Sequence, residues 1–508
     1  MFTQKFRQEE PEDKKIKRSL RRSILDGSFF NIMDGFTTPF IVPYALFLKS
    51  STIIISLLAS LPDLFASFFQ LLAIKASESF RSRKYLIVFS YIIQAALWLP
   101  LLLIPKFAKE GMSGTYMLLF MVLIAMFGAF GQPLWRNLMG ELVSEHERGS
   151  FFSKRNKIIA LVCFVATFAA GWILQRFSVT NVYEGFVVLF SVALVARIIS
   201  AFFISLMYEK KSFSAALIFK KKSDFTLLRF LRELPKSDYG KFVMFICLFR
   251  ISVSVASPFF AVYELKFLGF SYWQFTIISA VEILSSFLFL GLWGKINDEK
   301  GSRIVIIITG LLIPLVPLLY LFSADYVYLI LVTIISGAAW GGFNLAVGNF
   351  IFDASDKENR VKYVSYFNLL HGMAVFIGAM TGGMLLGMMP ATKESIKALF
   401  LISGLMRLAV AFFLFPAMKE MRIITIGFDK SMFNYSLFIK PRQGFVEDPF
   451  DYYMAYERKS NKPRPKLYME KAMLDDTPYK EPFEEKVKDH AKYQNFIQVL
   501  LDNAKKKK

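Results

Sequence analysis

Charged residues are scarce in this chain: 20% of its 508 residues are Asp, Glu, Lys or Arg, whereas 55% are hydrophobic. Soluble globular domains carry about 25% charged residues, so this composition argues against a soluble protein. The apolar residues also form long runs, at 53–73, 116–134, 185–207 and 304–322. Because about 20 apolar residues cross a bilayer as one helix, these runs indicate a polytopic membrane protein.

Cysteine is equally scarce, with two residues in the whole chain. Cys163 and Cys247 fall inside apolar runs, where a thiol behaves as a small apolar side chain. We therefore expect no disulfide, no metal site and no cofactor. The sequence also lacks a P-loop, a nucleophile elbow and a His/Asp metal box, so we expect neither an ATP-driven pump nor an enzyme.

The net charge is +21, and the basic residues gather in short segments between the apolar runs. This placement is typical of topology signals, and no nucleic-acid-binding signature accompanies it, so we expect no nucleic-acid partner. Most Lys and Arg residues follow the even-numbered runs, which predicts that both termini are cytoplasmic and that the protein lies in the cytoplasmic membrane. No small-residue cleavage pattern follows the basic N-terminus, so we expect no removable signal peptide.

The apolar runs, divided at helix-breaking residues, predict an all-α protein of about twelve transmembrane helices. The first six are expected at 23–48, 52–74, 85–105, 115–138, 155–176 and 183–207. The other six are expected at 240–267, 271–293, 304–322, 326–350, 363–388 and 395–416. They form two six-helix bundles, at 23–207 and 240–416. The remaining segments are expected in the cytoplasm, as an N-terminal segment at 1–22, a central loop at 208–239 and a tail at 417–508.

An internal repeat relates the two bundles. The matched positions are Pro39 with Pro258, Tyr44 with Tyr263, Asp63 with Glu282, Gln132 with Asn344, Arg148 with Arg360, and Arg197 with Arg407. Several matches in the same order predict two homologous halves that both begin on the cytoplasmic side. Such parallel repeats are related by an axis along the membrane normal, and the substrate site lies near the midplane between them.

One loop of the second half carries the pattern Gly294, Asp298, Gly301 and Arg303. This pattern resembles the G-x-x-x-D-x-x-G-x-R signature of the major facilitator superfamily, and the chain resembles its prokaryotic members over about residues 20–416. The first half departs from the signature, because Lys75 and Ser79 stand at two of its fixed positions. The resemblance implies two pseudo-symmetric bundles and a cavity lined by the first helix of each half.

Polar side chains far from the ends of the spans are candidates for substrate contact or coupling, because such groups are costly in hydrocarbon and face an interior cavity. They are Asp34, Asp63, Gln132, Arg250, Glu282 and Asn344. Asp63 and Glu282 lie deep in their spans, which leads to the hypothesis that at least one of them carries a coupling proton, with Asp34 as the competing carrier. Interhelical hydrogen bonding is an equally good explanation for Asp63 and Glu282. Packing or snorkelling is the favoured explanation for Arg197 and Arg407.

A second group of residues is expected to latch the cytoplasmic side. Its members are Glu141 and Arg148 in the first half, and Gly294, Asp298, Gly301, Arg303, Asp353 and Arg360 in the second. In this hypothesis Arg303 holds Asp353, Glu141 holds Arg83 or Lys84, and Asp298 faces the positive N-terminus of a neighbouring helix. The glycines would let the loop approach that helix. The alternative is that these charges serve only to retain the topology.

The expected function is secondary transport of a small solute by a monomer that uses alternating access, with or without protons. The alternative is a membrane receptor or scaffold that does not transport and acts through the tail at 417–508. Polar stripes beside the candidate residues, such as Ser56, Ser60 and Ser67 near Asp63, favour the transporter, because a water-filled cavity requires them. Membrane lipid is the other expected partner, since the tail ends in Lys505–Lys508.

Overall fold

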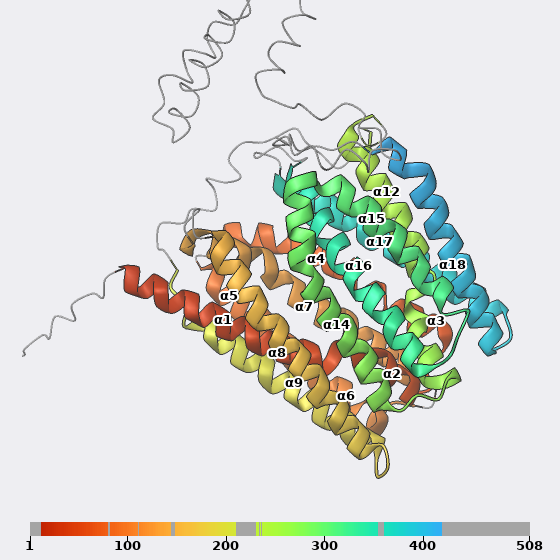
Figure 1. Cartoon of the computed structure of the whole chain (residues 1–508). Coiled ribbons are helices and arrows are strands. Elements are labelled where there is room, and N and C mark those ends of the chain that lie inside the picture. Colours follow the sequence, from red (N-terminus) through yellow and green to blue (C-terminus); the bar gives the residue numbers. More distant parts are fainter. Residues whose placement is uncertain are drawn as a thin grey trace, which may run out of the picture. The chain divides into compact units, whose positions relative to one another are not determined.

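The computed structural model describes residues 12–79, 82–109, 111–143, 148–209, 230–232, 234, 236–353 and 360–418. All elements of secondary structure in this part of the chain are helices (Figure 1). The tail and most of the central loop, which the sequence predicts to be cytoplasmic, lie outside the described residues.

The first helix of the first half is interrupted by a short 3₁₀ turn. Its elements are α1 (Glu12–Thr37), η1 (Thr38–Phe40), α2 (Ile41–Phe47), α3 (Thr52–Leu58), α4 (Leu61–Ser79), α5 (Arg83–Ala96), α6 (Trp98–Phe107), α7 (Ser113–Leu142), α8 (Arg148–Phe177) and α9 (Val182–Ser205). Two of the expected spans are each divided in two, since 52–74 corresponds to α3 and α4, and 85–105 corresponds to α5 and α6.

The second half repeats this order. Its elements are α12 (Asp238–Ser254), η2 (Ser257–Phe259), α13 (Phe260–Val262), η3 (Tyr263–Phe267), α14 (Tyr272–Lys300), α15 (Ser302–Leu319), α16 (Tyr326–Asp353), α17 (Arg360–Met388), α18 (Lys393–Leu414) and η4 (Phe415–Ala417). A single helix, α14, occupies the place that α3 and α4 share in the first half.

Within the described residues, 11 helical segments are long and apolar enough to cross a membrane. The expected span at 23–48 is not among them, because the C-terminal part of α1, from about residue 20 onward, contains four charged residues, Arg21, Arg22, Asp26 and Asp34. Its residues nevertheless form α1, η1 and α2. The helix also starts earlier than the sequence predicts, at Glu12, so it includes much of the expected N-terminal segment.

Both halves break their first helix at the repeated proline. Pro39 lies in the 3₁₀ turn η1, and Pro258 lies in the equivalent turn η2. Proline has no backbone N–H to donate and its ring crowds the preceding turn, so the α-helix ends there. Tyr44 and Tyr263, which follow these turns, are both fully buried. The sequence repeat therefore corresponds to an equivalent local structure in the two halves.

The helices of each half pack in one common pattern. In the first half α1 packs against α8 and α9, α4 against α7, and α5 against α7 and α9. In the second half α12 packs against α17 and α18, α14 against α16, and α15 against α16 and α18. The two bundles predicted from the repeat are thus present in the structure.

The halves contact each other through α8 with α14, and through α17 with α3 and α4. The backbone N–H of Trp273 donates to Gln175 Oε1 over 3.0 Å, and Gly171 leaves room for Thr276. The contacts between α8 and α14 lie near the helix ends opposite Arg83 and Arg303. We call that end of the bundle the far side, and the end with Arg83 and Arg303 the basic side.

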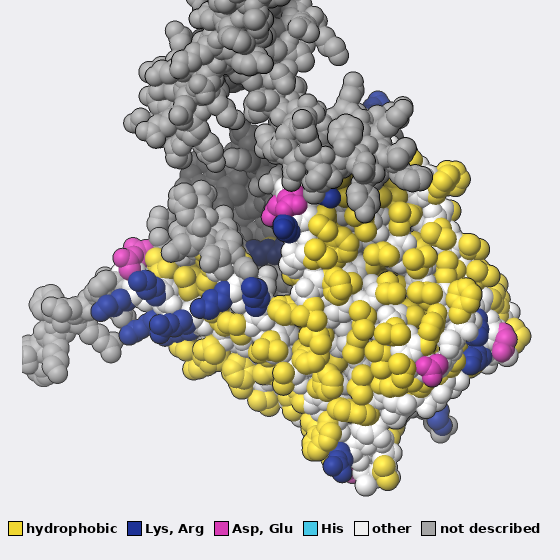
Figure 2. All heavy atoms as spheres, in the orientation of Figure 1, with side chains coloured by type: hydrophobic (Ala, Val, Ile, Leu, Met, Phe, Trp, Pro, Cys, Tyr) yellow, Lys and Arg dark blue, Asp and Glu magenta, His cyan; other side chains and the backbone are white. Residues whose placement is uncertain are grey.

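The outer surface suits a lipid environment. Figure 2 shows a broad apolar surface over the helices, with Lys and Arg side chains gathered along the first turns of α1. Large apolar side chains such as Phe89, Leu288 and Phe412 are exposed on this surface. An apolar belt with basic residues at one end is typical of a membrane-spanning bundle.

Candidate functional site

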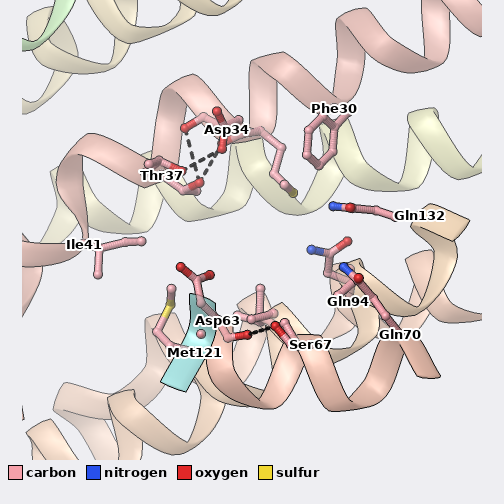
Figure 3. A pocket seen from close by; sticks show the side chains of 18 of the residues that line it. Phe30, Asp34, Thr37, Ile41, Asp63, Ser67, Gln70, Gln94, Met121 and Gln132 are labelled. Carbon is pink, nitrogen blue, oxygen red and sulfur yellow. Dashed lines mark hydrogen bonds between the residues drawn. The ribbon is translucent and has the colours of Figure 1, made fainter. Parts of the chain in front are cut away.

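A cavity of about 440 Å³ lies inside the bundle and is lined by helices of both halves (Figure 3). Its walls come mainly from α1, α4, α5 and α7, and α17 contributes from the second half. Figure 3 shows Asp34 and Asp63 on opposite walls, with Gln70, Gln94 and Gln132 grouped at one end. The volume is in the range of pockets that hold small molecules.

Asp34 reaches the cavity from the last turn of α1, just before the proline break. Its Oδ1 atom accepts a hydrogen bond from Thr38 Oγ1 over 2.7 Å. Its Oδ2 atom lies 3.9 Å from Cys163 Sγ on α8. The contacts of this carboxyl group are thus a hydroxyl and a thiol, both of which are neutral groups.

Asp63 reaches the opposite wall from the first turn of α4 and is exposed to the cavity. Asp63 lies at the start of a helix because the chain turns between Leu58, where α3 ends, and Leu61, where α4 begins. A carboxylate in the first turn is favoured by the helix dipole. Arg250 on α12 interacts with it electrostatically across the boundary between the halves.

Amide and imidazole groups complete the polar lining. Gln132 of α7 is exposed to the cavity, while Gln94 of α5 is buried and accepts a hydrogen bond from Arg197 Nε over 2.6 Å. Asn368 and His371 line the cavity from α17. Carboxyl, amide and imidazole groups together provide both donors and acceptors for a small polar molecule.

Arg250 and Asn344 were expected in the same site, but they are not among the residues that line this cavity. Instead Arg250 Nη2 donates to Asn344 Oδ1 over 2.9 Å. The guanidinium lies over the rings of Trp340 and Phe343, at 4.7 and 5.8 Å from their centroids. Arg250 acts on the cavity indirectly, through its electrostatic interactions with Asp63 and His371.

Glu282 does not line this cavity either, although it matches Asp63 in the repeat. Ser336 Oγ on α16 donates to its Oε1 atom over 2.8 Å. Gly337 allows this close approach, because a Cβ atom there would lie 2.3 Å from the Glu282 carbonyl oxygen. The Glu282 side chain therefore lies between α14 and α16, which pack closely against each other there. Asp63, its match in the repeat, faces the open cavity instead.

Sequence reasoning missed Asp26, which lies too close to the expected start of its span to attract notice. Asp26 is 4% exposed, and its Oδ1 atom accepts a hydrogen bond from Ser200 Oγ over 2.7 Å. Arg155 and Arg197 both interact with it electrostatically. Arg197 also donates a hydrogen bond to Gln94, which lines the cavity, so this network of charges reaches the cavity wall.

Glu264 was also missed, because it lies at an expected helix end. It is 3% exposed in the π-helical turn η3, and Tyr320 OH donates to its Oε1 atom over 2.8 Å. It also interacts electrostatically with Glu282. The second half therefore holds two neighbouring acidic groups, the buried Glu264 and the half-buried Glu282, and neither lines the cavity.

Two of the expected latch residues, Glu141 and its partner Arg83, are in direct contact. Arg83 Nη1 and Nη2 donate to the two oxygens of Glu141 over 2.8 and 2.7 Å. Arg83 Nε also donates to Glu209 Oε1 over 3.2 Å. Arg83 and Glu141 both belong to the first half, and Glu209 lies at the start of the central loop, so this pair does not bridge the two halves. The role of a latch stays a prediction.

The signature of the second half surrounds the turn between α14 and α15. Gly301 has φ 86° and its N–H donates to the Asn297 carbonyl, which ends α14. Asp298 is exposed in the last turn of α14, and Arg303 lies in the first turn of α15. The close approach expected at Gly294 is not found among the described residues, since none of their atoms apart from the neighbouring backbone of α14 lies within 4 Å of a Cβ built there.

The remaining latch residues lie at helix ends. Asp353 ends α16, while Arg148 and Arg360 begin α8 and α17. Their side chains fall outside the described part of the structure. Among the described residues there is also no group of three or more metal-ligating side chains.

Several solved transporters have the same fold. The nucleoside transporter NupG matches with a TM-score of 0.60 and 16% identity, covering 79% of this chain and 98% of its own. A bacterial homologue of the human lysosomal transporter Spinster, inward-facing and occupied, matches with a TM-score of 0.59 and 14% identity, covering 78% and 96%. The xylose transporter XylE from E. coli, in an inward-open conformation, matches with a TM-score of 0.57 and 14% identity, covering 80% and 96%.

The family assignment comes from the sequence of the chain. No curated protein sequence matches it at a significant level. The family model of the Major Facilitator Superfamily matches residues 26–291 and 242–443, which together span most of the chain and both repeated halves. The chain therefore belongs to the Major Facilitator Superfamily.

Proposed function

We propose that this chain is a secondary transporter that moves a small polar solute by alternating access, as a monomer in the cytoplasmic membrane. The observation that carries the proposal is the cavity of about 440 Å³, which helices of both halves line with carboxyl, amide and imidazole groups. A polar cavity between two repeated halves is the arrangement that alternating access requires. A receptor or scaffold has no such need for a solute-sized polar cavity.

The contacts between the halves support an inward-facing state. Trp273 with Gln175, and Gly171 with Thr276, join the halves near the far side. We propose that the basic side faces the cytoplasm, because Lys and Arg residues cluster on α1 at that side. In this orientation both termini are cytoplasmic, and the halves are closed toward the outside.

We assign the polar residues different roles in this proposal. Asp34, Asp63 and Gln132 contact the solute, since they line the cavity. Arg250 and Asn344 hold the charge of Asp63 from behind the wall. Asp63 is the proposed carrier of a coupling proton, with Asp34 and Glu282 as competitors. Asp298, Arg303, Asp353, Arg148 and Arg360 remain the proposed latch of the cytoplasmic side, and Glu141 supports it through Arg83.

Counterflow in liposomes tests the proposal. The purified full chain is reconstituted in vesicles preloaded with one solute from a panel of pentoses, nucleosides, amino acids and organic cations, and uptake of the labelled solute is measured. We expect saturable counterflow of at least one class and its loss in Gln132→Ala. The control is Glu299→Gln, which changes an exposed residue. Binding of a solute without any counterflow would favour the receptor instead.

A further inference from the structure

We infer that the transported solute carries a single positive charge and that its cationic group lies against Asp34. This inference names the substrate class of the site described above, and it rests on the proposed function. It follows from the balance of charges around the cavity rather than from the fold.

The charged groups of the lining are acidic. Asp34 and Asp63 line the cavity, and its described lining includes no lysine or arginine. In the second half, Arg250 interacts electrostatically with Asp63. Arg197 is buried behind Gln94, where it interacts with Asp26. Each of these two arginines thus already has an acidic partner.

Asp34 differs from Asp63 in this respect. The groups in contact with its carboxyl oxygens are the Thr38 hydroxyl and the Cys163 thiol, and neither carries a positive charge. A carboxylate removed from water is costly unless a cation or several strong donors accompany it. A cationic solute supplies the missing partner when it enters, so Asp34 selects for positive charge.

Other parts of the lining fit a cation as well. Trp98 lines the cavity, and aromatic faces attract ammonium groups. The amide oxygens of Gln132 and Asn368 can accept hydrogen bonds from an amine. An anion would instead meet two carboxyl groups, and a neutral solute would leave Asp34 without a partner. The charge balance therefore favours an organic amine with one positive charge.

A thiol placed beside Asp34 can measure this preference without knowledge of the substrate. The variant Thr38→Cys is made in a background of Cys163→Ala and Cys247→Ala, since these are the two native cysteines. Thr38 Oγ1 lies 2.7 Å from Asp34 Oδ1, so the new thiol lies next to the carboxyl group. Its rate of reaction is measured with two methanethiosulfonates of similar size, one carrying a trimethylammonium group and the other a sulfonate.

We expect the ratio of the cationic to the anionic rate to exceed the ratio for free mercaptoethanol at least about tenfold, because an adjacent carboxylate attracts one reagent and repels the other. Asp34→Asn should remove most of this excess, and Asp34→Glu should retain it. Ser67→Ala, which alters the lining without altering its charge, should leave the ratio unchanged. Tetraethylammonium should slow the labelling, whereas acetate and xylose should not.

A ratio equal to that of free mercaptoethanol, or protection by acetate or xylose alone, would overturn the inference. Failure of both reagents to react with a folded variant would also overturn it, because the site would then be closed to solutes. The proposed function fails in a different experiment. If an anion or a neutral solute shows counterflow and the labelling shows no cation preference, only the substrate class is rejected. If the labelling shows cation preference but no solute shows counterflow, transport is rejected.

Discussion

Glu141 holds Arg83 through two parallel hydrogen bonds, from Nη1 to Oε1 over 2.8 Å and from Nη2 to Oε2 over 2.7 Å. The Arg83 side chain is 3% exposed, so the pair is shielded from water. A guanidinium fork matches a carboxylate in a way that a lysine ammonium cannot. The contact ties the start of α5 to the last turns of α7.

Replacing Arg83 with lysine keeps the charge but removes the paired geometry. We expect Arg83→Lys and Glu141→Gln to destabilise the protein, with a coupling energy of roughly 0.5–3 kcal/mol in a double-mutant cycle. Reversible unfolding in mixed micelles measures it. The matched control is Lys295→Ala with Glu299→Gln, an exposed pair 3.9 Å apart, which should show little coupling. Additive effects of the two changes at Arg83 and Glu141 would contradict the prediction.

Asp26 is the acidic centre of the buried network in the first half. Asp26→Asn leaves Arg155 and Arg197 without the carboxylate that they share. Removing one member of a buried ionic network costs roughly 3–5 kcal/mol, which unfolding in mixed micelles should detect. Glu184→Gln is the control, because Glu184 is exposed on α9. A loss at Asp26 no larger than that of the control would show that the network adds no stability.

Two glycines of the same loop signature should respond to alanine with opposite signs. Gly301 has φ 86° and ψ 163°, a conformation open essentially to glycine alone, so Gly301→Ala should cost about 1–3 kcal/mol. Gly294 lies inside α14 with free space around it, so Gly294→Ala should stabilise the protein by about 0.5–1 kcal/mol. Thermal unfolding of the two variants provides the comparison. Equal effects would mean that backbone conformation does not set the end of α14.

Asp63 and Glu282 should differ in proton coupling, because one faces the cavity and the other is packed against α16. We expect Asp63→Asn to retain counterflow but to lose accumulation driven by a pH gradient across the vesicle membrane. Glu282→Gln should retain both, with a lower rate at most. Gradient-driven accumulation by Asp63→Asn at the wild-type level would exclude Asp63 as the proton carrier.

The orientation of the chain can be tested at its short loops. Single cysteines at Lys109→Cys and Lys393→Cys, in a background without native cysteines, should react with an impermeant maleimide added outside intact cells. Lys14→Cys, in the first turns of α1, should react only after the cells are opened. The reverse pattern would show that the basic side faces outward.

The helices and their repeat could be predicted because both depend on local sequence. Apolar runs of about 20 residues specify spans wherever they occur. The Pro-Phe-x₃-Tyr pattern recurs with the same 3₁₀ turn and the same buried tyrosine, at Tyr44 and Tyr263. For Arg197 and Arg407 the sequence favoured packing or snorkelling, and both are 2% exposed and held by hydrogen bonds inside the bundle.

The composition of the cavity wall could not be predicted, because it depends on how helices rotate against one another. Asp63 and Glu282 match in the repeat, but the turn before Leu61 places Asp63 at a helix start, while Glu282 remains inside the continuous helix α14. Arg250 likewise occupies a first helix without lining the cavity, since Trp340 and Asn344 hold it aside. Local periodicity does not contain this information.

The twin turns at Pro39 and Pro258 have a mechanical consequence. Each interrupts the backbone hydrogen bonds of a first helix. A helix bends more easily where such a bond is missing. Tyr44 anchors the segment beyond one break by donating to the Leu101 carbonyl over 3.0 Å. In the first half, the segment beyond the break is thus fixed to its own bundle, so a bend of the first helix at Pro39 need not disturb the packing at the far side.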